Sequence, residues 1–271
     1  MTTAAATAVG ARAAGRLRTW LSLRHSLRAH AAMVLALYGF YELARGLVVG
    51  DAAEADRHAH RVVALERSLH LFLEANVQHA ARALPGFTGL LGAAYLTLHL
   101  AVTAGILLWL HQRRPAAFPF VRTTLLLASG LALVGFLVYP TAPPRLAGIG
   151  LVDTVSSGRV DLNHGLVSSL YNPDAAVPSM HIGYALVVGA SLLRYGRSHV
   201  VHLAGVLYPL FVLLVVVATG NHFFFDAATG AITVALAAGS TLLITRPSTP
   251  DRLARLHERP RTRWESEKLA A

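Results

Sequence analysis

Long apolar runs divide this chain, and they constrain its fold more than any other feature. A helix needs roughly 20 apolar residues to cross the hydrocarbon core of a bilayer. Runs near this length recur along the 271 residues, and only 14% of the residues are charged, where a soluble domain has about a quarter. The sequence therefore predicts an all-α fold, a polytopic membrane bundle of about six transmembrane helices. The expected spans are Ala31–Val49, Phe87–Leu110, Phe118–Tyr139, His181–Leu193, Val200–Thr219 and Phe223–Thr245.

The fourth span is shorter than the others. Hydropathy alone does not predict it. It fits the bundle if its N-terminus begins below the membrane surface, in a site enclosed by the other helices.

The arginines give the spans an orientation. Cytoplasmic loops of membrane proteins hold most of the Lys and Arg residues. With both termini inside, the cytoplasmic segments hold 17 of the 24 Lys and Arg residues. We therefore expect basic cytoplasmic tails at residues 1–29 and 246–271, around one membrane domain at residues 30–245. The loop at residues 140–178 and the turn Gly220–His222 then both face the extracytoplasmic side. The high Arg and Ala content indicates a prokaryotic source, and hence the plasma membrane.

The segment Arg61–Gln78 has a different pattern. Its apolar residues recur at three- and four-residue steps with charged residues between them, which is typical of an amphipathic helix. The apolar positions are Val62, Leu65, Leu69, Phe72 and Leu73, and the charged ones are Arg61, Glu66, Arg67 and Glu74. We expect one interfacial helix along the outer membrane surface. An ordinary packing helix of an extracellular cap fits the pattern equally well.

Composition also restricts the partners and cofactors. The net charge of +10 fits attraction to anionic lipid rather than nucleic acid, because the arginines flank apolar runs. The chain has no cysteine and no H-E-x-x-H pattern, so we expect no metal and no other cofactor. The expected partners are the bilayer and a lipid phosphate or phospholipid substrate.

Three polar segments interrupt the apolar background. They are Tyr139–Arg145, Val177–His181 and Thr219–His222, the last followed by Asp226, and each lies at the outer end of an expected span. Polar groups at membrane depth are costly and usually functional. These segments are therefore the candidate functional site.

His222 and Asp226 form the most specific pair. Four residues apart at the start of a helix, they can lie on one face. A carboxylate that accepts a proton from one imidazole nitrogen fixes the tautomer and leaves the other nitrogen free to attack. A purely structural i,i+4 pair remains the alternative.

His181 and Arg145 supply the next two groups. Pro178 and Ser179 suit a helix start, where free N–H groups attract an anion and a protonated His181 can serve as general acid. Arg145 follows two prolines, which fix its direction, and its guanidinium suits a phosphate group.

Ser179, Gly220 and Asn221 would add donors or allow close backbone approach. Three outer-loop carboxyl groups can touch a headgroup, but nothing singles one out; they are Asp153, Asp161 and Asp174. His99 and His164 are expected to be structural.

These segments resemble the signatures of the type 2 phosphatidic acid phosphatase superfamily, which includes vanadium haloperoxidases. Pro-Ser-Met-His and Gly-Asn-His-x3-Asp look like its second and third signatures. The Pro-Thr-Ala-Pro-Pro-Arg segment resembles the branch that contains inositol-phosphorylceramide synthases. The resemblance covers about Phe118 to Thr245.

The resemblance implies a mechanism. His222 attacks phosphorus and becomes a phosphohistidine, Asp226 orients it, and His181 protonates the leaving group and then activates the acceptor. Arg145, with donors near Ser179 and Asn221, stabilises the equatorial oxygens without a metal. The sequence departs from the broad family at Val138 and Val216, where two phosphate-binding cations would stand.

Three functions remain open at this stage. A lipid-phosphate phosphatase is the leading hypothesis. A phosphotransferase that moves a phospho-headgroup between lipids shares the first half-reaction. A transporter or lipid-binding protein without catalysis is less favoured, because the polar motifs gather at one face and no repeat is found.

Overall fold

The computed structural model describes residues 39, 51–155 and 174–245. Apart from Gly39, the expected first span Ala31–Val49 lies outside the described residues, as do both tails. The described part of the chain is all-helical, as predicted, and an isolated β-bridge joins Thr141 to Ala175. Its seven helices are α3 (Ala52–Ser68), α4 (Glu74–Arg82), α5 (Phe87–Arg113), α6 (Phe118–Val138), α8 (Met180–Tyr195), α9 (His199–Ala218) and α10 (Phe224–Thr245).

Four of these helices, α5, α6, α9 and α10, are long and apolar enough to cross a membrane. Their ends lie within three residues of the expected bounds. The chain is therefore a membrane protein, and the total of about six spans stays a prediction.

Helix α8 occupies the place of the short fourth span. It has 16 residues, or about 24 Å of helix. It packs against α5, α6, α9 and α10, and most of its side chains up to Ser191 are buried. A helix shorter than the bilayer core thus fits because other helices surround it.

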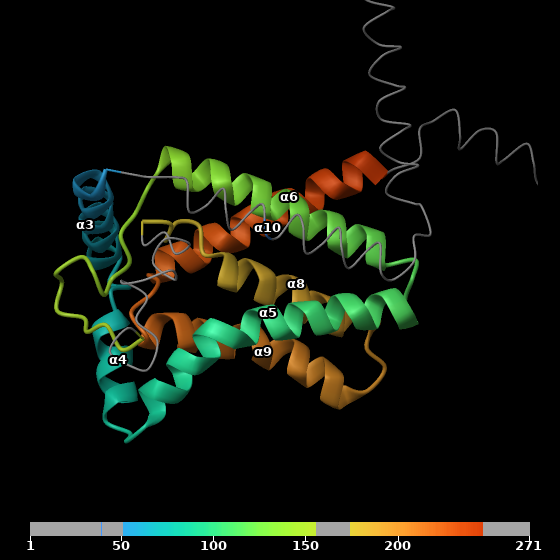
Figure 1. Cartoon of the computed structure of the whole chain (residues 1–271), viewed down its shortest axis with the longest axis horizontal. Coiled ribbons are helices and arrows are strands. Elements are labelled where there is room, and N and C mark those ends of the chain that lie inside the picture. The colour runs from blue at the N-terminus through green and yellow to red at the C-terminus, as the bar shows by residue number, and fades with distance from the viewer. Residues whose placement is uncertain (1–38, 40–50, 156–173, 246–271) are drawn as a thin grey trace, which may run out of the picture.

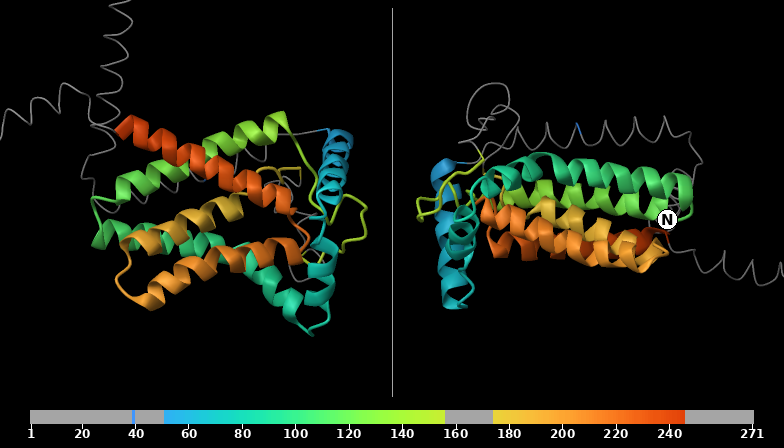
Figure 2. Two further views of the ribbon diagram at one scale, coloured as in Figure 1. Left: turned by 180° about the vertical axis from the view of Figure 1, so that it is seen from behind. Right: turned by 90° about the horizontal axis from the view of Figure 1, so that it is seen from below.

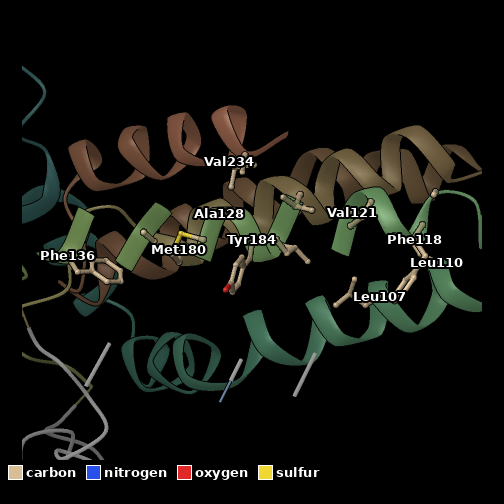
Figure 3. Close-up of a cluster of buried hydrophobic side chains, with 14 residues drawn as sticks. Leu107, Leu110, Phe118, Val121, Ala128, Phe136, Met180, Tyr184 and Val234 are labelled. Atoms are coloured by element: carbon tan, nitrogen blue, oxygen red, sulfur yellow. The ribbon is translucent and has the colours of Figure 1, made fainter. Parts of the chain in front are cut away.

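The long helices lie side by side along the long axis of the molecule (Figure 1). Figure 3 shows the apolar cluster between α5, α6, α8 and α10, where Phe136 and Met180 lie at one end and Leu110 and Phe118 at the other. Ala128 of α6 is fully buried in this cluster, and its small side chain lets the neighbouring helices approach closely.

Helices α8 and α9 cross at two glycines. A Cβ atom on Gly189 would lie 2.5 Å from the carbonyl oxygen of Gly205, and one on Gly205 would lie 2.9 Å from the oxygen of Gly189. Such small residues let two membrane helices touch through their backbones. This crossing fixes α8, and therefore the segment that precedes it, against α9.

The amphipathic segment is not one helix. The chain leaves α3 after Ser68 and re-enters helix at Glu74, with His70 between them at φ 57°. Both helices lie across one end of the bundle (Figures 1 and 2). The prediction of a single helix over Arg61–Gln78 was wrong, because helical periodicity cannot continue through this turn.

Two of the charged residues of this segment do not face the surface. Glu66 and Glu74 are buried, at 3% and 0% exposure. The carboxyl groups turn inward because backbone N–H groups at the start of α10 need acceptors there.

Candidate active site

The candidate site lies where two helix N-termini meet, at the end of the bundle nearest α3 and α4 (Figure 1). The N–H of Ser179, which precedes α8, donates to the carbonyl oxygen of Asp226 in the first turn of α10, at 3.0 Å. Gly230, one turn further along α10, has no room for a Cβ atom, which would overlap the carbonyl oxygen of Ser179. Two helix N-termini in contact give a region that favours an anion.

His222 is hydrogen-bonded to Asp226 in this region. The distance between His222 Nδ1 and Asp226 Oδ2 is 3.1 Å, and both residues are buried. The same carboxylate oxygen also accepts the backbone N–H of Phe223 at 2.9 Å. Asp226 therefore binds both the imidazole and the backbone beside it, and the Nδ1–H tautomer leaves the lone pair of His222 Nε2 available.

His181 faces His222 from the first turn of α8, with 5.7 Å between the ring centroids. Its ring stacks on Tyr95 at 4.3 Å and contacts the ring of His99 at 4.0 Å. Its Nε2 atom lies 3.3 Å from the carbonyl oxygen of Tyr95. Tyr95 and His99 of α5 thus hold the ring, and His99, expected to be structural, adds a third imidazole beside those of His181 and His222.

Arg145 forms the cationic part of the site. Its Nε donates to Asn221 Oδ1 at 2.9 Å, and its Nη1 forms an ion pair with Asp153 Oδ2, also at 2.9 Å. Its backbone N–H donates to the carbonyl oxygen of Gly220. The side chain is buried, so these contacts fix the direction of the guanidinium. Asp153 of the outer loop therefore contacts a predicted site residue through its carboxyl group, while Asp161 and His164 lie outside the described residues.

The turn before His222 depends on Gly220. Gly220 adopts φ +68°, and an added Cβ atom would lie 3.1 Å from Gln78 Nε2 and 3.2 Å from Arg145 Cβ. Only glycine adopts such a backbone readily where the surroundings are this close. The next residue, Asn221, donates to Thr219 Oγ1 at 2.9 Å, so its amide oxygen points to Arg145.

Ser179 precedes α8 as expected, but its side chain does not cap the helix. Its Oγ atom is buried and has no hydrogen-bond partner within the described residues. A buried hydroxyl group without a partner is costly unless a ligand or water completes it. This arrangement fits a donor to a bound phosphate oxygen.

The structure thus brings all seven predicted site residues together. They are His222, Asp226, His181, Arg145, Ser179, Gly220 and Asn221. Sequence reasoning missed the supporting roles of five side chains on α3, α4 and α5, which are His58, Glu66, Glu74, Gln78 and Tyr95. No local motif marks them, because each contacts a segment that is distant in the sequence.

Gln78 and His58 join the end helices to the site. Gln78 Nε2 donates to the carbonyl oxygen of Val152 at 2.9 Å, and its Oε1 accepts the N–H of the same residue at 2.8 Å. His58 Nδ1 lies 2.7 Å from the carbonyl oxygen of Pro140, and the ring stacks on Tyr139 at 4.0 Å. Helices α3 and α4 therefore hold both ends of the loop that carries Arg145.

The positions of the two missing cations hold no charge. Val138 ends α6 and is 74% exposed, whereas Val216 is fully buried and accepts the N–H groups of Asn221 and His222 through its carbonyl oxygen. Among the described residues, no group of three or more His, Cys, Asp or Glu side chains could hold a metal ion. Within residues 51–155 and 174–245, Arg145, Ser179 and the two helix N-termini supply donors at the site.

The sequence profile of the PAP2 superfamily matches residues 60–240, which is most of the chain and includes every predicted site residue. The chain belongs to the PAP2 superfamily. PAP2 members are typically phosphatases or related phosphotransferases, so membership indicates phosphatase or phosphotransferase activity. The inositol-phosphorylceramide-synthase-like branch stays a prediction, and no curated protein and no solved structure shows significant similarity to the chain.

Proposed function

We propose that this PAP2 protein is an integral membrane lipid-phosphate phosphatase that works through a phosphohistidine at His222, without a metal. The hydrogen bond between His222 Nδ1 and Asp226 Oδ2 carries the proposal. It holds the tautomer in which Nε2 can act as nucleophile.

In the first half-reaction, His222 Nε2 attacks phosphorus and the P–O bond to the lipid alcohol breaks. His181 gives its proton to the leaving alkoxide. In the second half-reaction, His181 takes a proton from water while the water oxygen attacks phosphorus. The P–N bond breaks, inorganic phosphate leaves, and His222 recovers its lone pair.

Arg145 and the Ser179 hydroxyl group would bind the equatorial phosphoryl oxygens. Their charge and donors stabilise negative charge that develops in the transition state. The positive ends of α8 and α10 act in the same direction.

The second candidate function is transfer of a phospho-headgroup to a lipid alcohol. The segment Pro140–Arg145 favours it, since it resembles the synthase-like branch. In this case the organic acceptor replaces water in the second half-reaction, and no free phosphate appears.

The test uses detergent-purified protein with lipid phosphates and phosphodiester lipids in the presence of a metal chelator. Both free phosphate and new lipid products are followed. We expect free phosphate from monoester lipids, lost on His222→Ala and on His181→Ala. An acid-labile phosphoryl label should form on the protein and be absent from His222→Ala.

The matched control is His60→Ala, because His60 is an exposed histidine of α3. It should turn over as the wild-type protein does. Near wild-type turnover by a folded His222→Ala protein would refute the nucleophile. New phospholipid without free phosphate would establish the transferase instead.

We also propose that the site faces the extracytoplasmic side of a plasma membrane, with both termini cytoplasmic. The distribution of Lys and Arg along the sequence supports this orientation. A membrane-impermeant substrate analogue should therefore be hydrolysed by intact cells. Hydrolysis only after permeabilisation would reverse the orientation.

A further inference from the structure

Two buried carboxyl groups lie behind the His222–Asp226 pair. Glu66 of α3 accepts the backbone N–H of Phe225 through Oε1 at 2.7 Å. Glu74 of α4 accepts the N–H of Phe224 through Oε1 at 3.0 Å. Together with Asp226, which accepts the N–H of Phe223, three carboxyl groups take three consecutive N–H groups at the start of α10.

These contacts have a clear electrostatic reason. The first N–H groups of a helix have no intrahelical partner, and the N-terminus carries a partial positive charge. Carboxyl oxygens accept hydrogen bonds from these N–H groups, and their negative charge is attracted to the helix N-terminus. Because α10 begins two residues after His222, the carboxyl groups also fix the backbone that carries the imidazole.

Three buried carboxyl groups whose acceptor atoms serve consecutive N–H groups repel one another when all are ionised. Glu66 and Glu74 are almost wholly buried, and the N–H groups that they accept belong to two adjacent residues, Phe225 and Phe224. In the described part of the chain, the Oε2 atom of each has no donor. One proton between the two carboxyl groups removes one charge and gives both Oε2 atoms a partner.

The raised pKa of the Glu66 carboxyl group agrees with this arrangement. Burial raises the pKa of the Glu66 carboxyl group to about 9, and the charges of Glu74 and Asp226 act in the same direction. The N–H of Phe225 opposes them. His222 faces the same group of carboxylates through its bond to Asp226.

We propose that Glu66 and Glu74 share one proton and together hold the start of α10, so that His222 stays aligned on Asp226. They are positioning residues, since their hydrogen bonds are to the backbone at the start of α10. This inference rests on the proposed function for its catalytic readout. Its structural readout is independent of that function.

The chain offers a direct test, because glutamine mimics a protonated glutamate. In Glu66→Gln, Oε1 still accepts from Phe225 and the amide donates to the carboxylate of Glu74. Glu74→Gln works in the same way. In the double variant both side-chain oxygens are needed by the backbone, so two NH₂ groups oppose each other without an acceptor.

We expect kcat of each single variant within about threefold of wild type, and a fall of about 10- to 100-fold in the double variant, with KM little changed. If the two carboxyl groups acted independently, the fall in kcat of the double variant would instead equal the product of the falls in the two single variants. The ratio of kcat for Glu66→Gln to that of wild type should rise above about pH 9, where Glu66 loses its proton.

A second measurement needs no turnover. A carboxyl group whose pKa rises on folding stabilises the protein at low pH, and this stabilisation is lost as pH rises from about 4.5 to about 9. The melting temperature of the wild-type protein should fall more over this range than that of Glu66→Gln. Asp56→Asn is the matched control, as Asp56 is a half-exposed carboxyl group of α3, and it should follow the wild type in both assays.

The outcomes separate the two proposals. If no lipid phosphate is turned over, the proposed function fails, while the melting curves still decide whether the carboxyl pair exists. Single variants as impaired as the double variant would overturn the shared proton. So would melting curves of wild type and Glu66→Gln that depend on pH in the same way.

Discussion

Adding one methyl group at Gly230 should disrupt the contact between the two helix starts of the site. A Cβ atom there would overlap the carbonyl oxygen of Ser179 and lie 3.1 Å from its carbonyl carbon. Both are backbone atoms, so no side chain can rotate away. Relief requires α8 and α10 to separate by about 1 Å, since carbon and oxygen atoms at rest stay near 3.5 Å apart.

This separation acts on stability and on catalysis. It strains the 3.0 Å hydrogen bond from Ser179 N–H to Asp226 and moves His181 relative to His222. Overpacking of this kind lowers the free energy of unfolding by about 1–3 kcal/mol. The higher helix propensity of alanine offsets up to about 1 kcal/mol of this loss. A misplacement of about 1 Å between reacting groups can lower kcat by about 100-fold.

The same helix provides the control. Gly239 lies in α10 with nothing within 4 Å of an added Cβ atom. Gly239→Ala should therefore keep wild-type turnover, with an equal or higher melting temperature. Turnover of a lipid phosphate and thermal melting are measured for both variants in one detergent. If Gly230→Ala matches Gly239→Ala in both assays, the close contact at Ser179 does not set the geometry of the site.

Three further substitutions test other parts of the site. Asp226→Asn should lower kcat by up to about 10⁴-fold, because an amide no longer holds the required tautomer of His222; a fall of less than about tenfold would exclude that role. Arg145→Lys should raise KM and lower kcat/KM by about 10- to 100-fold in steady-state assays, as one ammonium group cannot reproduce the two guanidinium contacts. Gln78→Ala should cost about 1–3 kcal/mol in denaturant or thermal unfolding, since it leaves the N–H of Val152 without its side-chain acceptor.

The membrane helices could be predicted closely from the sequence. A transmembrane helix satisfies its own backbone hydrogen bonds, so its length and position follow from the apolar run alone. This is why α5, predicted as Phe87–Leu110, is confirmed with its start unchanged. The end helices α3 and α4 could not be predicted in this way, since their buried faces depend on what they contact.

In the candidate site too, local contacts could be predicted from the sequence and long-range contacts could not. The pairing of His222 with Asp226 is a local i,i+4 contact, and the structure confirms their proximity. The contacts of Gln78 and Glu66 join residues more than 70 positions apart, which no single-sequence pattern reveals. Glu66 in particular looked like a solvated residue of a polar helix face.

The ion pair between Arg145 and Asp153 gives the cation an internal counter-ion. A phosphate group that binds at Nη1 has to replace the carboxylate of Asp153, which belongs to the same chain as Arg145. Charge attraction alone therefore adds little to the binding free energy of a phosphate group. Dilute inorganic phosphate competes poorly with Asp153, which is covalently held beside Arg145. A ligand held in the bilayer by its own hydrocarbon chain competes more effectively with Asp153 for Arg145, because its local concentration beside the site is high. The ion pair would thus favour entry of an anchored ester and departure of the free anion that its hydrolysis releases.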